Sequence, residues 1–432
     1  MFDILISGPT IVSVGPHGLI KRGYLAIKGQ RIAALGECPV PPDLRSAETI
    51  EAEGMVMLPG LVNAHTHLAM TLMRGLADDM EVMEWLEKRI WPLEAKLTEE
   101  DCYWGGMLGA IEMLRGGTTC FNDMYYHFEV TTQVIVESGM RGCPSLVLLG
   151  FLPFSEQSLA RAADLPDDWS AKREGRVVPM LGPHAAYSCN ERYLAEVVNV
   201  AKKKGMGIHI HLSESRKEVE ESLREFGKTP IARVAEVGLF ECPTLAAHCV
   251  HVTPEDIQIL SRFGVGVSHN PGSNLKLASG FAPVLEMIRQ GVTVGLGTDG
   301  AASNNNLDMF EEMRLAALLP KATSGDPTAL RAFQALEMAT LGSARALGLD
   351  KEIGSLEVGK KADIVLVDFR RPHLVPCFDV VSDIVYSARA DDVHTVIVDG
   401  KVVLKERRFT KLDEEEILSK ASQRAHSLVE RV

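Results

Sequence analysis

The chain has 432 residues, more than one ordinary hydrophobic core accommodates, so we expect one large barrel with an added module, or two domains. It carries 58 acidic against 45 basic residues, which argues against nucleic acid and anionic membranes as partners. No basic segment precedes the first strand-like run, and no apolar run is long enough to span a bilayer, so we expect a cytoplasmic protein. Eight scattered cysteines without a Cys-x-x-Cys pair argue against disulfides and a thiolate zinc site.

The chain begins with strand-like segments that glycine or proline turns separate. They cover residues 3–14, 23–35 and 47–58, and similar segments at 362–369 and 393–409 follow near the other end. Two β-rich ends around one central region predict a composite β-sandwich from residues 1–57 and 360–410. The last segment, 411–432, has helical period and many charges, and we expect a surface helix or a contact within a homo-oligomer there.

Between residues 55 and 300, short apolar runs rich in β-formers alternate with longer segments of helical period. Eight strand-then-helix units with strands apolar on both faces predict an α/β protein with a closed parallel (β/α)₈ TIM barrel over residues 58–359. A doubly wound open sheet is the alternative, but no glycine-rich phosphate motif follows the first strand. The eight runs end near His65, Asp123, Gly150, His184, His211, His248, His269 and Asp299.

Side chains able to do chemistry gather at these predicted strand ends, where a barrel of this kind has its active site. His65 and His67 stand two residues apart in the segment LVNAHTH, so both leave the same face of one strand. With His211 and Asp299 they form a candidate metal set, because neutral imidazoles and a carboxylate suit Zn²⁺ or Fe²⁺ and leave one position for water. Any one of these histidines alone is better explained by a core or surface role.

The chain resembles the amidohydrolase superfamily through PGLVNAHTH, HIHLSES, AAHCVH, SHNPGSN and GTDGAASNNNLDM. Within it, MEWLEKRIWPLEAKLTEED, DMYYH and LGPHAAYSC are similar to the branch of 5-methylthioadenosine/S-adenosylhomocysteine deaminases, whose relatives act on 5'-deoxyadenosine, guanine and s-triazines. The resemblance covers nearly the whole chain, the split β-sandwich included. Several branches bridge two metals with a modified lysine at the end of the fourth strand. That strand ends VVPMLGPH here, so we expect one divalent metal per chain, Zn²⁺ first and Fe²⁺ second.

The resemblance implies hydrolytic deamination of an adenosine derivative. A divalent metal makes bound water acidic enough to supply hydroxide at neutral pH, and attack on C6 of adenine requires the adjacent ring nitrogen to gain a proton. Glu214, three residues past His211, is the candidate proton shuttle, Asp299 would take the water proton, and His248 would polarise the hydroxide. The resemblance implies the same roles. A solvated loop carboxylate is the alternative interpretation of Glu214.

Further residues are candidates for binding a small nucleoside. The resemblance implies that Glu94 accepts hydrogen bonds from the ribose 2' and 3' hydroxyls, whereas a carboxylate at a helix end is the alternative. His184 would contact the substrate, as would Glu214 and Asp299. Ser303, together with Asn304, would hold Asp299 or the ligand.

The loop after the third strand departs from the family pattern, in which arginines hold the amino-acid tail of S-adenosylhomocysteine. Arg161 is its one mid-loop arginine, while Arg173 and Arg176 lie close to the next strand. A single guanidinium can bind a carboxylate bidentately, so Arg161 is the candidate for the tail. His251 is interpreted as a cap of the following helix, and His269 is as easily structural as functional.

Two other functions stay open. The same metal site would serve another heterocycle, such as guanine or an s-triazine. Alternatively, the barrel is a non-catalytic scaffold that a metal stabilises. A structural metal does not need Glu214, His248 and an open coordination position together, so the scaffold is the weaker hypothesis.

Overall fold

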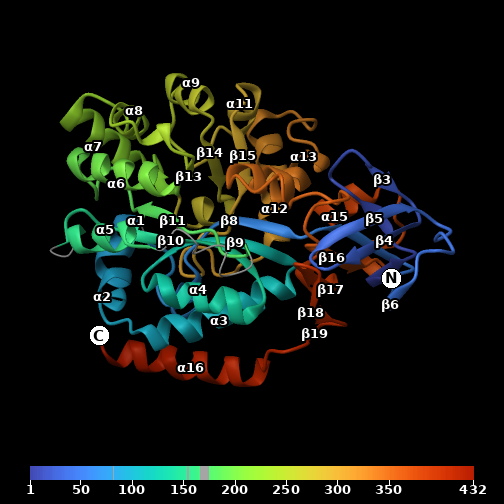
Figure 1. Cartoon of the computed structure of the whole chain (residues 1–432). Coiled ribbons are helices and arrows are strands. Elements are labelled where there is room, and N and C mark those ends of the chain that lie inside the picture. Colours follow the sequence, from blue (N-terminus) through green and yellow to red (C-terminus); the bar gives the residue numbers. More distant parts are fainter. Residues whose placement is uncertain (81, 153–154, 166–174) are drawn as a thin grey trace.

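A parallel barrel of eight strands forms the centre of the molecule (Figure 1). The structure is a computed structural model and describes residues 1–80, 82–152, 155–165 and 175–432. Just past the last strand, the amide of Asp299 donates to the carbonyl of His65 at 3.0 Å, which joins the two ends of the sheet. The (β/α)₈ barrel predicted from the sequence is confirmed. Each strand pairs with the next along the chain: β8 (Leu61–Thr66), β9 (Thr118–Tyr125), β10 (Arg141–Leu148), β11 (Met180–Pro183), β12 (Gly207–Leu212), β13 (Thr244–His248), β14 (Gly266–His269) and β15 (Thr293–Leu296).

Helices surround the barrel on its outside (Figure 1). Five barrel strands, β8, β9, β11, β13 and β14, are buried at every residue, as expected for a parallel sheet that closes on itself beneath helices. The helices between and after the strands are α3 (Glu99–Arg115), α4 (Phe128–Ser138), α5 (Ser155–Ala163), α6 (Glu191–Lys204), α7 (Arg216–Phe226), α8 (Pro230–Glu236), α9 (Pro254–Phe263), α10 (Pro271–Lys276), α11 (Val284–Arg289), α12 (Met309–Ser324), α13 (Ala332–Glu337) and α14 (Ser343–Ala346).

Two local features fix the course of the chain near the site. After β8 the chain forms short turns of helix before the long α3: η1 (Leu68–Met73), α1 (Val82–Trp85), η2 (Leu86–Ile90) and α2 (Trp91–Glu94). The amphipathic stretch after β12 becomes two helices, because Gly227 takes a φ of +68° and ends α7. Thr229 then accepts a hydrogen bond from the amide of Ala232, and Pro230 occupies the first turn of α8.

Both ends of the chain contribute to a β-sandwich beside the barrel, as predicted. One sheet has the order β5-β4-β1-β6 and the other β19-β18-β17-β16-β7-β2-β3. Isoleucines and leucines from both sheets share one core, so the sheets pack face to face. The strands are β1 (Phe2–Ser7), β2 (Thr10–Val12), β3 (Leu19–Ile20), β4 (Gly23–Lys28), β5 (Arg31–Glu37), β6 (Ser46–Glu51), β7 (Met55–Pro59), β16 (Ile364–Asp368), β17 (Val393–Val398), β18 (Lys401–Lys405) and β19 (Arg408–Phe409), with α15 (Val380–Tyr386) between β16 and β17.

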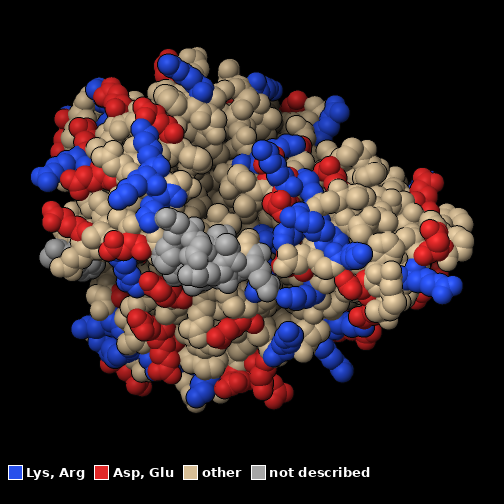
Figure 2. Space-filling model, in the orientation of Figure 1, with Lys and Arg blue, Asp and Glu red and all other residues tan. Residues whose placement is uncertain are grey.

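The last helix, α16 (Glu414–Glu430), lies along α3 at one edge of the molecule (Figure 1). The side chain of Asp101 in α3, fully buried, accepts hydrogen bonds from Arg424 at 2.6 Å and Arg431 at 2.9 Å. On the face shown in Figure 2, Lys and Arg side chains are intermixed with Asp and Glu. Within the described ranges, none of the helices combines the length and apolar character needed to cross a membrane.

Candidate active site

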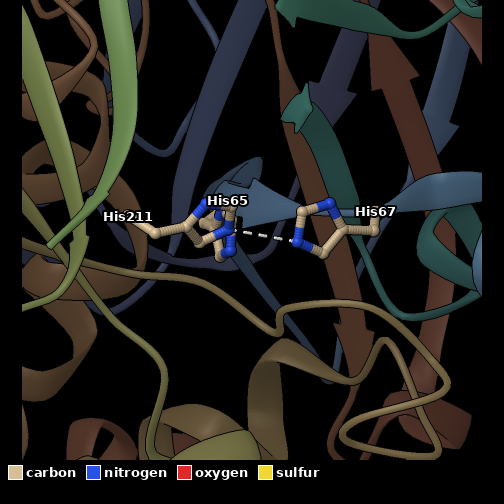
Figure 3. A group of neighbouring side chains, drawn as sticks. All are labelled: His65, His67 and His211. Carbon is tan, nitrogen blue, oxygen red and sulfur yellow. Dashed lines mark hydrogen bonds between the residues drawn. The ribbon is translucent and has the colours of Figure 1, made fainter. Parts of the chain in front are cut away.

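The four predicted metal ligands lie together at the carboxyl ends of the strands. His65 and His67 extend from β8, and His211 extends from β12 toward them (Figure 3). The Nε2 atoms of His67 and His211 are 3.2 Å apart, and those of His65 and His67 are each 3.3 Å from Oδ1 of Asp299. Three imidazole nitrogens and one carboxylate oxygen therefore face a common point, which is a donor set suited to a divalent transition metal.

In His67 and His211, Nδ1 forms a hydrogen bond with a backbone carbonyl, and Nε2 points to the candidate metal position. Nδ1 of His67 donates to the carbonyl of Met124 at 2.6 Å, and Nδ1 of His211 donates to the carbonyl of His184 at 2.8 Å. A proton on Nδ1 leaves the lone pair of Nε2 available for a cation.

His65 is oriented by a chain of buried side chains that sequence analysis missed. Its Nδ1 lies 2.8 Å from Nε2 of His209, whose own Nδ1 lies 3.0 Å from the hydroxyl of Ser145. Ser145 donates to the side-chain oxygen of Asn122, and the amide nitrogen of Asn122 lies 3.1 Å from the same Nδ1 of His209, so these side chains form one buried network behind His65. The alternation HIH in β12 could have revealed His209, since residues two apart share a strand face.

Charge and burial also fit a cation. Nε2 of His65 is buried and has no hydrogen-bond partner among the described groups. Burial lowers the pKa of His65 to about 4 and holds that of His211 well below its usual range, so both rings are neutral at pH 7. Burial opposes ionisation of Asp299, but the surrounding histidine rings, that of His65 first, hold its pKa well below the usual range. Neutral imidazoles and an ionised carboxylate are the forms that bind a metal.

Glu214 and His248 lie beside this set. Nε2 of His248 is 3.9 Å from Oε2 of Glu214 and 4.0 Å from Oδ2 of Asp299. Burial raises the pKa of Glu214, which favours the protonated form of its carboxyl group. Burial also works against a charge on His248, yet the nearby carboxylates of Glu214 and Asp299 raise its pKa.

Two of these residues have a backbone conformation that is uncommon outside glycine. His248 has a φ of +74° and Asp299 a φ of +62°. Such conformations cost on the order of 1–3 kcal/mol and persist where surrounding contacts impose them. Asn274 contacts Nδ1 of His248 at 2.9 Å, and the hydroxyl of Ser273 donates to Asp299 at 2.6 Å. The loop after β14 therefore holds both side chains in place.

Glu312 of α12 links the start of α10, which follows β14, to the segment after β15. Its carboxyl accepts from the amide of Gly272 at 2.9 Å and from the side chain of Asn304 at 2.8 Å, and it has no exposed surface. A Cβ at Gly272 would lie 2.3 Å from the Glu312 carboxyl, so only glycine fits this close approach. Burial raises the pKa of Glu312 to about 8. The sequence contained one indication of this role: Glu312 lies on the buried face of the helix with Met309 and Met313, where a glutamate is unusual.

The candidates for nucleoside binding lie around the metal set. Glu94, half-buried, is the last residue of α2, and burial raises its pKa to about 7 against the opposing effect of the Tyr125 and Tyr126 hydroxyls. His184 follows β11, and its ring centroid is 4.9 Å from that of His211. The hydroxyl of Ser188 lies 3.0 Å from its Nδ1. His184 therefore borders the candidate metal ligands, and Glu94 contacts Tyr125, whose ring centroid is 6.2 Å from that of His67.

Other predicted contacts differ from expectation. Ser303 donates to the carbonyl of Gly300, and Asn304 donates to the carbonyl of Thr298 and to Glu312. The hydroxyl that holds Asp299 is that of Ser273, so the prediction that Ser303 or Asn304 holds this carboxylate is wrong, and the alternative of a ligand contact remains for Ser303.

The interpretation of His251 as a helix cap is also wrong. Thr253 caps α9, and Nε2 of His251 donates to the carbonyl of Ser279 at 2.6 Å instead. His269 is buried at the end of β14, and burial lowers its pKa to about 3.

The predicted arginines of the region after β10 have separate environments. Arg161 lies in α5, where its guanidinium forms an exposed ion pair with Glu129. Arg176 donates to the carbonyl of Met140 at 2.9 Å, which fixes it to the barrel. Arg173 lies outside the described residues.

The sequence and the structure of the chain are both similar to those of known proteins. Residues 56–403 match the model of the amidohydrolase family. The chain is 49% identical to a 5-methylthioadenosine/S-adenosylhomocysteine deaminase of Pelotomaculum thermopropionicum and 46% identical to a 5'-deoxyadenosine deaminase of Methanosarcina mazei, in each case over 100% of both chains. Among solved structures it is similar to an adenosine deaminase from Xanthomonas campestris with bound zinc, at 37% identity, a TM-score of 0.94 and 99% of each chain.

Proposed function

Because the chain belongs to the amidohydrolase family, as the resemblance in its sequence predicted, we propose that it is a hydrolytic deaminase that converts the 6-amino group of an adenosine derivative to the inosine form and releases ammonia. The substrates proposed are 5'-methylthioadenosine, S-adenosylhomocysteine, 5'-deoxyadenosine and adenosine. The observation that carries the proposal is the donor set of three imidazoles and Asp299 with Glu214 and His248 beside it.

His65, His67, His211 and Asp299 would hold one divalent cation, with Zn²⁺ as the first candidate and Fe²⁺ as the second. When bound, this ion would supply water that is acidic enough to attack at neutral pH. The unpartnered Nε2 of His65 and the ionised Asp299 support this assignment.

The protein side chains move the protons. Asp299 accepts a proton from the attacking water, and His248 polarises that water by hydrogen bonding. Glu214 delivers a proton to the ring nitrogen next to C6, which the raised pKa of its carboxyl favours. Asp299 then passes the water proton to the amino group at C6, which leaves as ammonia when the tetrahedral centre collapses, and Glu214 regains a proton from the remaining C6 hydroxyl.

The nucleoside is held from the side of β9 and β11. Glu94 accepts hydrogen bonds from the ribose 2' and 3' hydroxyls, and His184 and Ser303 contact the substrate. Glu214 and Asp299 complete the binding of the base. Arg161 can take a carboxylate in the 5' substituent only when its ion pair with Glu129 opens.

Ammonia release tests the proposal. The purified protein is mixed with 5'-methylthioadenosine, S-adenosylhomocysteine, guanine and melamine in parallel. Ammonia from the two nucleosides, with an absorbance change from the adenine to the hypoxanthine chromophore, is the expected result. Ammonia from guanine or melamine alone would establish the alternative heterocycle, and none from any of the four would refute the deaminase.

A further inference from the structure

The short helix that carries Glu94 lies beside the last helix of the chain. α2 has four residues, and a helix of this length needs contacts with other parts of the protein to keep its position. Leu93 of α2 belongs to the same buried apolar cluster as Leu428 of α16, which has no exposed surface. The end of α16 lies next to α2 in Figure 1. α16 therefore contributes to the position of Glu94.

Arg431, the residue after α16, connects this region to α3 through its guanidinium. Its Nη1 donates to the carbonyl of Lys96 at 3.0 Å, its Nη2 donates to Oδ2 of Asp101 at 2.9 Å, and its Nε donates to the carbonyl of Ser427 at 3.1 Å. Three hydrogen bonds in different directions hold the planar group in one orientation. Lys96 lies two residues past Glu94, in the turn that joins α2 to α3. Arg431 therefore fixes the backbone close to the Glu94 side chain.

Other contacts hold α16 on α3 without Arg431. Nε of Arg424 donates to Oδ1 of Asp101 at 2.6 Å. At the other end of the helix, Nε of Arg115 donates to Oε1 of Glu414 at 2.7 Å. Loss of the Arg431 guanidinium thus leaves α16 attached to α3 at both ends. What it removes is the connection to the turn between α2 and α3.

We propose that Arg431 is a positioning residue for the sugar of the substrate, because its hydrogen bond to Lys96 sets where the carboxyl of Glu94 meets the ribose hydroxyls. The inference rests on the proposed function, in which Glu94 binds these hydroxyls. The hydroxyls of Tyr125 and Tyr126 lie beside the same carboxyl and orient the side chain. Arg431 fixes the backbone from which that side chain extends. Misplacement of a contact by about 1 Å can reduce reaction rates about 10²-fold, so a looser turn should have a measurable effect.

Arg431→Met tests the inference, because methionine keeps an apolar side chain and removes every donor. We expect kcat/KM on 5'-methylthioadenosine to fall about three- to fivefold, mainly through KM, and that on its 2'-deoxy analogue to fall less. Metal content should not change. Arg431→Lys keeps a donor for the carbonyl of Lys96 and should retain most of the preference for ribose. Glu414→Gln weakens the contact at the far end of α16 and is the matched control, with an unchanged preference expected.

The double variant of Glu94→Gln and Arg431→Met separates an effect through Glu94 from a general loss of stability. If Arg431 acts through Glu94, Arg431→Met causes no further loss of ribose preference once Glu94 is replaced. An additive loss of preference in the double variant would overturn the proposal. Equal losses of kcat/KM and Tm in Arg431→Met and Glu414→Gln would overturn it as well, because α16 would then only stabilise the fold.

Hydrogen exchange tests the position of the turn independently of catalysis. The amides of residues 95–97 should exchange faster in Arg431→Met than in the wild type or in Glu414→Gln, and equal exchange in all three would refute the role of Arg431. If the wild type deaminates neither 5'-methylthioadenosine nor S-adenosylhomocysteine, the proposed function fails. The ribose preference is then measured as the ratio of Kd for 5'-methylthioadenosine and its 2'-deoxy analogue, and a ratio that Arg431→Met leaves unchanged would overturn the inference.

Discussion

The candidate metal ligands and the arginine proposed for the 5' substituent of the substrate belong to different parts of one barrel. His65, His67 and His211 belong to strands, and two of them are fixed by hydrogen bonds to backbone carbonyls of neighbouring strands or strand ends. Arg161 belongs to α5, a helix between two strands, and is paired with Glu129 of α4. The sheet therefore positions the residues of the proposed chemistry. Substitutions in the connecting helices can alter which substrate is bound without moving those residues.

Metal removal is expected to have the largest effect and to be independent of substrate. Chelation should abolish deamination of every nucleoside, and about one equivalent of Zn²⁺ per chain should restore it, since the two candidate groups found among the described residues share His65 and form one site, and β11 contains no lysine to bridge a second ion. Metal analysis of the purified protein gives the stoichiometry. Two tightly held ions per chain would contradict this assignment.

Glu214→Gln comes next and should also affect all substrates alike. An amide cannot carry the proton, so kcat should fall by about 10²–10⁴-fold on 5'-methylthioadenosine and S-adenosylhomocysteine equally, with metal content and Tm unchanged. Steady-state kinetics on both nucleosides measure the effect. A kcat near that of the wild type would show that Glu214 is not part of the mechanism. Unequal losses of kcat on the two nucleosides would show that Glu214 also affects the choice of substrate.

Glu94→Gln should affect binding of the sugar rather than the chemical step. Loss of a charged acceptor costs roughly 1.5–3 kcal/mol per hydrogen bond, so kcat/KM on 5'-methylthioadenosine should fall about tenfold or more, and that on its 2'-deoxy analogue should fall less. An unchanged preference for ribose over deoxyribose, with only a lower Tm, would favour the helix-end interpretation.

The pH dependence sharpens this test. The carboxyl of Glu94 has a pKa raised to about 7, and the ionised form is the stronger acceptor, so the preference for ribose should increase as pH rises through about 7. Glu94→Gln should remove that increase. A wild-type preference that is flat between pH 6 and pH 8 would be the contrary result.

Glu312→Leu should have the smallest effect on activity. It leaves the amide of Gly272 and the side chain of Asn304 without their acceptor, which should lower the free energy of unfolding by about 2–4 kcal/mol and reduce kcat a few-fold, since Asp299 is held less firmly. Urea unfolding and kinetics measure both. Glu311→Leu, on the exposed side of the same helix, is the control. If both variants lose equal amounts of unfolding free energy and of kcat, Glu312 has no positioning role.

The sequence predicted the strand ends and the donor set because both depend on local patterns. Fully buried runs mark the strands, and the spacing of His65 and His67 places both on one face. The choice of Ser273 over Ser303 as the partner of Asp299 could not be predicted, because it depends on how two loops approach one another. The role of Glu312 likewise depends on a contact with Gly272, which is distant in sequence.

The junction between β7 and β8 has a consequence for synthesis of the protein. Only Gly60 separates β7, a central strand of the seven-stranded sheet, from the strand that carries His65 and His67, and β7 lies between β2 and β16. The ribosome completes β16 roughly 300 residues after β7, which at usual elongation rates is about 15–60 s. Throughout that interval the strand leading into the first two ligands has one edge without its native neighbour. A nascent chain that ends before β16 should therefore be a poor acceptor of metal, and protection of β7 from proteases should appear only once the C-terminal strands emerge.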